Sequence, residues 1–144
     1  MKRLSIYILL SLFLVVFATS KTSAQDNELV NVCALGIGNA TYLKDFKVKL
    51  PASAAAAPST KFNVILNKGT MYKITVCNAE GYEGKAVVSL LEGPKALGSN
   101  LNADGSFQPA IGFMCQKTGM YNIVVSFKGG KEGAAVAILS YVNK

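Results

Sequence analysis

Residues 42–50 read Tyr42-Leu43-Lys44-Asp45-Phe46-Lys47-Val48-Lys49-Leu50. Within this stretch the apolar residues Phe46, Val48 and Leu50 alternate with charged residues. Successive side chains of a β-strand point to opposite faces, so a period of two places one set against a core and the other in solvent. The stretch therefore predicts an amphipathic β-strand.

The same period recurs along the chain and predicts an all-β protein. Alternation is clear in residues 62–66, 72–76 and 121–127. Apolar runs add four candidate strands, at residues 29–35, 86–92, 107–115 and 134–142. The last run is apolar on both faces, which is typical of a central strand. We expect an antiparallel β-sandwich or jelly roll of about eight strands, with little or no helix.

The connections between these runs carry turn residues. Residues 67–70, 117–119 and 129–133 supply Gly between two β-rich runs, and this spacing predicts hairpins. The Ala-rich residues 51–58 lie between two prolines and are too few to nucleate a helix, so we expect a loop there. The expected core residues are Phe46, Val48, Leu66, Tyr72, Ile74, Val88, Leu90, Phe113, Tyr121, Ile123, Val125 and Ile138.

The N-terminus has the pattern of an export signal. Lys2 and Arg3 precede an apolar stretch at residues 6–16, and the small residues 22–24 end in Ala24. A charged start, a short apolar segment and a small-residue cleavage site define a secretory signal peptide. We expect cleavage after Ala24, a single β-sandwich domain at residues 25–144, no transmembrane segment after cleavage, and a periplasmic or secreted protein.

The charge and composition of the chain argue against several classes of function. The 144 residues include no His, and the only Arg is Arg3. After cleavage, 12 Lys and 8 acidic residues give a net charge of +4, spread along the chain. No Arg remains to bind a phosphate in bidentate fashion, so nucleic acid is not an expected partner. The absence of His removes the usual zinc and iron ligands and the Ser-His and Cys-His forms of catalysis, and we expect no enzyme and no cofactor. The alternative is a small glycan hydrolase that uses two carboxylates, one of them Glu80 or Glu83.

Three cysteines allow at most one internal disulfide. If every connection between the expected strands reverses the chain, strands 70–77 and 107–115 run the same way. Cys77 and Cys115 then lie at the same end of the sandwich, whereas Cys33 belongs to a strand of the opposite direction. In an oxidising compartment this predicts a Cys77–Cys115 disulfide with Cys33 left over. The alternative is three buried, reduced thiols.

Two sets of residues are candidates for a binding site. Tyr82, Phe107 and Tyr42 are aromatic residues in expected loops or near strand ends, where a glycan-binding protein places flat rings. The alternative is that they cap the core. Asn100, Asn102 and Asp104 alternate before Gly105 as at the start of a calcium loop, but the twelfth position is Ile111 rather than Glu. An Asx-rich turn is the alternative there.

Residues 69–77, 86–91 and 113–125 together resemble the pre-peptidase C-terminal type of bacterial β-sandwich. They are also similar to small secreted Bacteroidetes proteins of unknown function. The chain departs from the first family at Lys85 and Ala86, where that family has an Asp-rich strand entry. The resemblance implies a sandwich fold and an exported accessory role, and it brings no catalytic residues.

The function expected from the sequence is therefore non-catalytic. One hypothesis is a recognition module that binds a glycan or an envelope protein through its loops or an exposed sheet face. Another is a structural accessory protein whose envelope partner pairs with an open sheet edge.

Overall fold

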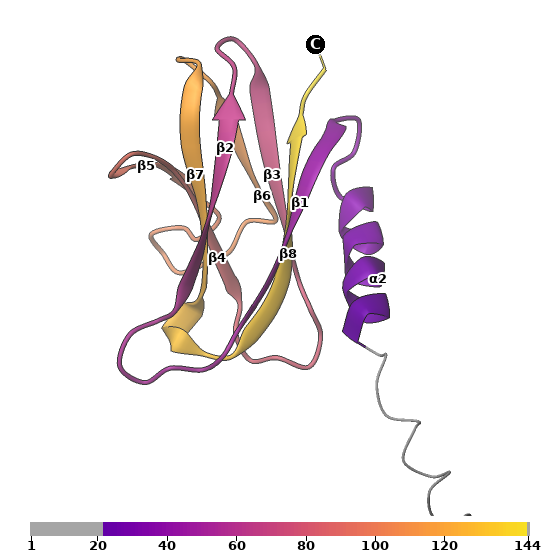
Figure 1. Ribbon diagram of the computed structural model, residues 1–144, viewed down its shortest axis with the longest axis vertical. Helices are drawn as coiled ribbons and strands as arrows, with labels where there is room; N and C mark the ends of the chain where they lie inside the picture. The colour runs from indigo at the N-terminus through magenta and orange to yellow at the C-terminus, as the bar shows by residue number, and fades with distance from the viewer. Residues whose placement is uncertain (1–21, 144) are drawn as a thin grey trace, which may run out of the picture.

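The computed structural model describes residues 22–143, which form a β-sandwich with one helix packed on its outside (Figure 1). The elements are α2 (Thr22–Leu35), β1 (Thr41–Leu50), β2 (Ser59–Leu66), β3 (Met71–Asn78), β4 (Ala86–Glu92), β5 (Lys95–Ser99), β6 (Ala110–Met114), β7 (Gly119–Phe127), the 3₁₀ turn η1 (Lys128–Gly130) and β8 (Gly133–Tyr141). The predicted signal peptide at residues 1–24 lies outside the described residues except for its last three, where α2 begins. That segment and the predicted domain at residues 25–144 stay predictions.

Two antiparallel sheets of four strands confirm the expected fold class. Sheet A has the order β1-β8-β3-β6, and sheet B has the order β2-β7-β4-β5. Residues 134–142 were expected to form a central strand, and β8 indeed lies between β1 and β3. We call the end that holds the β2–β3 and β6–β7 turns the turn end. The opposite end, with the β1–β2 and β3–β4 connections and η1, is the loop end (Figure 1).

The predicted hairpins are wrong. The turns at residues 67–70, 117–119 and 129–133 each lead from one sheet to the other, because β2 and β7 belong to sheet B while β3, β6 and β8 belong to sheet A. Among the described residues, the β4–β5 connection is the one that joins two consecutive strands of the same sheet, and it forms a hairpin. Turn residues specify that the chain reverses, but not that the two strands pair.

The predicted core is largely correct. Eleven of the twelve expected core residues are buried, and Phe113 is half-buried against the same cluster. Ile138 is fully buried on the other face of sheet A, where α2 covers it together with Val136. The alternating strands thus fill the space between the sheets, and β8 also has a buried outer face, as its continuous apolar sequence requires.

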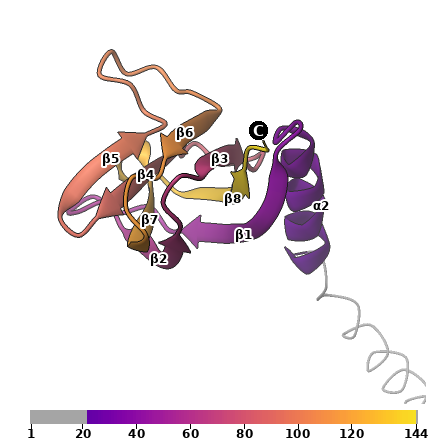
Figure 2. The same cartoon turned by 90° about the horizontal axis from the view of Figure 1, so that it is seen from above.

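Residues 29–35 form part of α2, so the predicted strand there is wrong. Leu29, Val30, Cys33, Ala34 and Ile37 pack against sheet A, at the spacing of one face of a helix. The helix lies along the outer face of sheet A, on the side away from sheet B (Figure 2). Strand β5 was not predicted from the sequence, so the total of eight strands is correct although one member differs.

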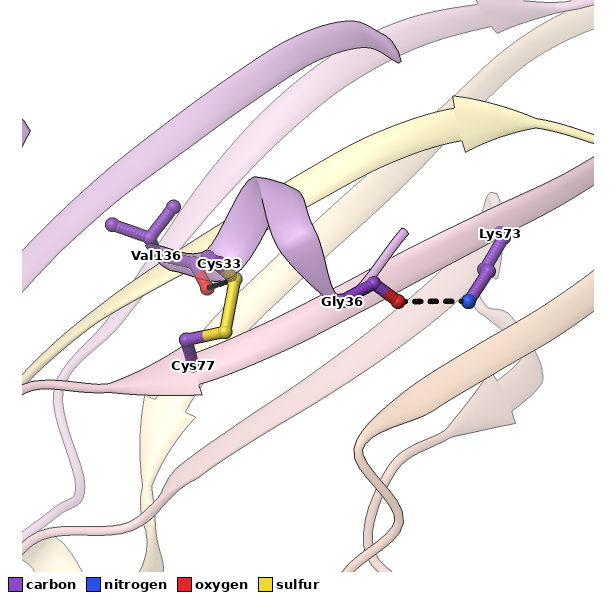
Figure 3. Close-up of a disulfide and its surroundings, with 5 residues drawn as sticks. All are labelled: Cys33, Gly36, Lys73, Cys77 and Val136. Atoms are coloured by element: carbon purple, nitrogen blue, oxygen red, sulfur yellow. Dashed lines mark hydrogen bonds between the residues drawn. A yellow bond between two sulfur atoms is a disulfide. The ribbon is translucent and has the colours of Figure 1, made fainter. Parts of the chain in front are cut away.

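The predicted Cys77–Cys115 disulfide is wrong as well. Cys77 is bonded to Cys33, which fastens α2 to β3 beside Val136 (Figure 3), and Cys115 is free and buried. The missed strand β5 adds one chain reversal, so β6 runs antiparallel to β3 and pairs with it directly. Cys77 therefore lies toward the loop end of β3, while the backbone N–H of Cys115 donates to Thr70 at the turn end.

Cys115 and Tyr121 form a small polar cluster inside the turn end. The Tyr121 hydroxyl donates to the carbonyl oxygen of Lys117 at 2.5 Å, and the Cys115 thiol lies 3.6 Å from that hydroxyl. The hydrogen bond with Cys115, followed by burial, raises the pKa of Tyr121 to about 12. The folded protein therefore holds this proton more tightly than the unfolded chain, whose tyrosines have a pKa near 10.

This raised pKa predicts a loss of stability in alkali. Because unfolding releases the Tyr121 proton between pH 10 and pH 12, the free energy of unfolding decreases as the pH rises through that range. Urea denaturation across the range measures the decrease. We expect Tyr121→Phe to show a smaller decrease than the wild type, and equal slopes would contradict the assignment.

Candidate functional site

The three aromatic candidates do not come together in the structure. Tyr42 is on β1 at the turn end, whereas Tyr82 in the β3–β4 loop and Phe107 before β6 lie toward the loop end. Tyr42 is exposed, and its hydroxyl donates to the carboxylate of Asp45. That hydrogen bond holds the Tyr42 ring beside its own strand. It also raises the pKa of Tyr42 to about 12.

Tyr82 borders a groove between α2 and the β3–β4 loop. The groove has a volume of about 420 Å³ and is lined by Asp26, Glu28, Leu29 and Val32 of the helix and by Glu80 and Tyr82 of the loop, among others. Lys49 approaches the Tyr82 ring, with its Nζ 5.6 Å from the ring centroid. A hydrogen bond with Tyr82 raises the pKa of Lys49, with smaller contributions from Glu132 and Asp26.

The acidic residues of the predicted hydrolase alternative differ in their surroundings. Glu80 lines the groove, whereas Glu83 forms an exposed ion pair with Lys131 at 3.3 Å. The carboxylate-dependent hydrolase stays a prediction.

The candidate calcium residues divide between two environments. Asn100 is buried, and its side-chain amide bonds the backbone of β4: Oδ1 accepts from the N–H of Val88, and Nδ2 donates to the carbonyl of Ala86. Asn102 and Asp104 lie in the following loop and both bond Ser106. Within residues 22–143, no group of three or more His, Cys, Asp or Glu side chains is arranged to hold a metal ion. Asn102 and Asp104 thus belong to a hydrogen-bonded turn, whereas the Asn100 side chain bonds β4, and the calcium site stays a prediction.

Two adjacent turns are hydrogen-bonded to each other and project from the turn end of the sandwich (Figure 1). The N–H of Lys68 donates to Thr118 Oγ1 at 2.8 Å, and the N–H of Gly69 donates to the Cys115 carbonyl at 2.8 Å. These bonds join the β2–β3 turn, residues 67–70, to the β6–β7 turn, residues 115–118. We call these two turns and the apolar residues that flank them the ridge.

Exposed apolar side chains gather toward the turn end, and those on β2, β6 and β7 flank the ridge. Eight large apolar side chains are strongly exposed in the described part of the chain, and six of them lie at the turn end. These six are Tyr42, Leu43, Ile65, Met114, Met120 and Val142. Ile65 pairs in register with Met120 on the outer face of sheet B, and Met114 pairs with Met71 on the outer face of sheet A. Apolar pairs therefore lie on both sides of the ridge, and lysines occupy its two turns.

This surface was not predicted from the sequence. Lys68 and Lys117 are 49 positions apart and come together only because β2 pairs with β7 and β3 with β6. Ile65 and Met120 each lie where the alternation predicts an outward side chain. An apolar residue at such a position indicates an exposed apolar surface, and this was the signal in the sequence that could have predicted the ridge.

The comparisons with known proteins show the fold. No protein-family model matches the sequence, and a search of curated proteins finds no match. Among solved structures, the chain is similar to Aeromonas hydrophila PliG, a periplasmic lysozyme inhibitor of g-type lysozyme. The TM-score is 0.51 at 13% sequence identity, and the match covers 71% of this chain and 88% of that chain. The resemblance to the pre-peptidase C-terminal type stays a prediction.

The Cys33–Cys77 disulfide indicates an extracytoplasmic protein, because disulfides persist in oxidising compartments. Over the described residues, no helix is both long and apolar enough to cross a membrane.

Proposed function

We propose that the chain is an extracytoplasmic, non-catalytic binding protein whose partner is a glycan hydrolase, and that the ridge is its binding surface. The observation that carries this proposal is the gathering of six of the eight strongly exposed large apolar side chains at the turn end. Exposed apolar groups that cluster on one surface mark an interaction site. The fold that the chain shares with a periplasmic lysozyme inhibitor supports the class of partner.

The shape and charge of the ridge favour a concave, acidic partner surface. Lys68 and Lys117 occupy the turns, and apolar pairs lie behind them on each side. Such a projection is complementary to a cleft with carboxylates at its floor and apolar walls. Most glycoside hydrolases carry a pair of Asp or Glu residues in the substrate cleft. Insertion of the ridge would bring the two ammonium groups to those carboxylates and block the substrate.

The ridge is also organised before binding. The Tyr121 hydroxyl holds the carbonyl of Lys117, and the Tyr72 hydroxyl accepts from the N–H of Asn67 at 2.9 Å. Lys117 forms a long, exposed ion pair with Glu92 at 3.8 Å, which costs little to exchange for a partner's carboxylate. A surface that is already ordered loses little conformational entropy on association, and this favours affinity.

A g-type lysozyme is the first probe of this proposal. We expect the mature protein to bind it and to reduce its lytic activity, and the paired variant Lys68→Glu with Lys117→Glu to weaken binding about tenfold or more. Isothermal titration calorimetry and a lysis assay measure the two quantities. The paired variant Lys47→Glu with Lys61→Glu, which makes the same charge change at exposed positions toward the loop end, is the matched control.

Two results would overturn parts of the proposal separately. Absence of any binding by the wild type would exclude this hydrolase class as the partner. Binding by the wild type that the paired ridge variant leaves unchanged would exclude the ridge as the surface. Ile65→Ser with Met120→Ser, both at exposed positions, tests the apolar side of the ridge without disturbing the core.

A further inference from the structure

Phe107 is presented on a small, well-ordered hairpin near the loop end. Leu101 and Phe107 form an isolated antiparallel bridge. The N–H of Asn102 donates to the carbonyl of Ser106 at 2.8 Å, and the reversal passes through Gly105 with a φ of +86°. The N–H of Gln108 donates to the carbonyl of the buried Asn100 at 2.7 Å. The position of the Phe107 ring is therefore fixed by the fold.

Two lysines converge on this ring. The Nζ of Lys128 lies 5.5 Å from the centroid of Phe107, and the Nζ of Lys85 lies 6.0 Å from it. Their backbones are bonded to each other, since the N–H of Lys128 donates to the carbonyl of Lys85 at 3.0 Å. The Nζ of Lys128 also reaches the carbonyl of Gly105 at 3.4 Å. Two positive charges are thus held beside one half-buried aromatic ring.

Among the described residues, neither Lys85 nor Lys128 has a carboxylate oxygen within ion-pair distance. The ion pairs found there are Lys117 with Glu92 and Lys131 with Glu83. Asp104, the acidic residue of the hairpin, directs its Oδ1 to the N–H and hydroxyl of Ser106. Two ammonium groups near one ring raise the local positive potential, and an anion bound close to them would be stabilised by it.

We propose that Phe107, Lys85 and Lys128 form a binding site for an acidic saccharide. The carboxylate of a sugar acid would pair with the ammonium groups, and an apolar face of the sugar ring would pack on the exposed part of Phe107. Aromatic rings supply apolar contact area at low entropic cost, and lysines supply the charge. The backbone of the hairpin is paired internally, so it offers little to a peptide that would add as an extra strand, a mode in which main-chain hydrogen bonds give the affinity.

The site is independent of the proposed function, because it lies at the opposite end from the ridge. The groove beside Tyr82 provides an internal comparison. There an aromatic ring and a lysine also meet, but carboxylates of Asp26, Glu28 and Glu80 line the same groove. An anionic ligand is therefore expected at Phe107 and not at Tyr82.

The test is an NMR titration of the mature protein with an oligogalacturonate and with a neutral oligosaccharide of the same length. We expect the acidic oligosaccharide to shift the amide signals of residues 101–108 and of Lys85 and Lys128. The double variant Lys85→Gln with Lys128→Gln, and separately Phe107→Leu, should each weaken binding about tenfold. Lys49→Gln at the Tyr82 groove should bind as the wild type does.

Four results would overturn the proposal. The first is a wild type that does not bind the acidic oligosaccharide, and the second is equal binding of the neutral one. Inorganic phosphate that displaces the saccharide completely, with Phe107→Leu unchanged, would show a simple anion site. Tighter binding of poly-glutamate than of the oligogalacturonate would show a peptide site. A thermal melt of each variant confirms that it is folded.

Discussion

Reduction of the Cys33–Cys77 disulfide lowers the expected free energy of unfolding by about 4 kcal/mol. The bond joins residues 44 positions apart, and a cross-link across such a loop mainly restricts the unfolded chain. Urea denaturation with and without a reductant measures the change. The double variant Cys33→Ala with Cys77→Ala is the control, because the reductant should leave its stability unchanged. A wild type that is equally stable in both states would contradict the prediction.

After reduction of the disulfide, α2 should unfold before the rest of the protein. Besides the disulfide, α2 is held by apolar contacts with Val136 and Ile138, and Lys73 donates to the carbonyl of Gly36 just beyond the helix at 3.0 Å (Figure 3). These contacts are few compared with those within the sandwich, so the helix is expected to open before the sheets do. Limited proteolysis of the reduced protein should therefore cleave within residues 22–40 while the sandwich remains intact. Simultaneous loss of both parts would show that α2 and the sheets unfold as one unit.

The strands were predictable because each carries its own signal. Phe46 and Val48 on β1, and Tyr121, Ile123 and Val125 on β7, are buried at every second position, as the alternation required. Residues 29–35 carry an apolar run instead, and such a run is equally compatible with a strand and with a buried helix. The structure resolves this ambiguity through contacts with β8 and β3, which lie more than 35 positions further along the chain.

One missed strand was enough to misplace the disulfide. Residues 95–99, Lys-Ala-Leu-Gly-Ser, have no clear alternation and contain a Gly, so β5 gave no strand signal. It forms by pairing with β4, which is a tertiary contact. Since the direction of each later strand depends on the number of reversals before it, the error reversed the expected direction of β6 and moved Cys115 to the wrong end.

The candidate sites were predictable only as single residues. Phe107 and Tyr82 could be named as aromatic residues in loops, but the lysines beside them come from other elements. Lys85 precedes β4 and Lys128 follows β7, and they meet because Ala86 and Phe127 are register partners. No spacing in the sequence predicts that Lys85 and Lys128 are brought together in this way. The same holds for the ridge, whose two turns are joined by hydrogen bonds between distant residues.

Asn100→Ala is expected to lower the free energy of unfolding by about 2 to 5 kcal/mol. Ser99 is the last residue of β5. One more backbone bond joins the chain to β4, from the N–H of Asn100 to the carbonyl of Val88 at 3.1 Å, and the Asn100 side chain supplies two further bonds. Its Oδ1 accepts from Val88 at 2.7 Å, and its Nδ2 donates to Ala86 at 3.0 Å. Asn100 is only 2% exposed, so water cannot easily replace the lost bonds, and an N–H and a C=O group would remain buried without partners.

The matched control is Asn102→Ala, two residues further along in the same loop. Asn102 bonds Ser106 and Gln108 in an exposed turn, and we expect a loss of less than about 1 kcal/mol there. Urea denaturation of both variants, with and without calcium, separates the structural role of Asn100 from the predicted calcium site. If the amide of Asn100 is committed to β4, calcium leaves the wild type and both variants unchanged, and only Asn100→Ala is strongly destabilised. If instead calcium stabilises the wild type and each substitution abolishes that gain, then both asparagines are ligands, and Asn100 must leave β4 when the ion binds.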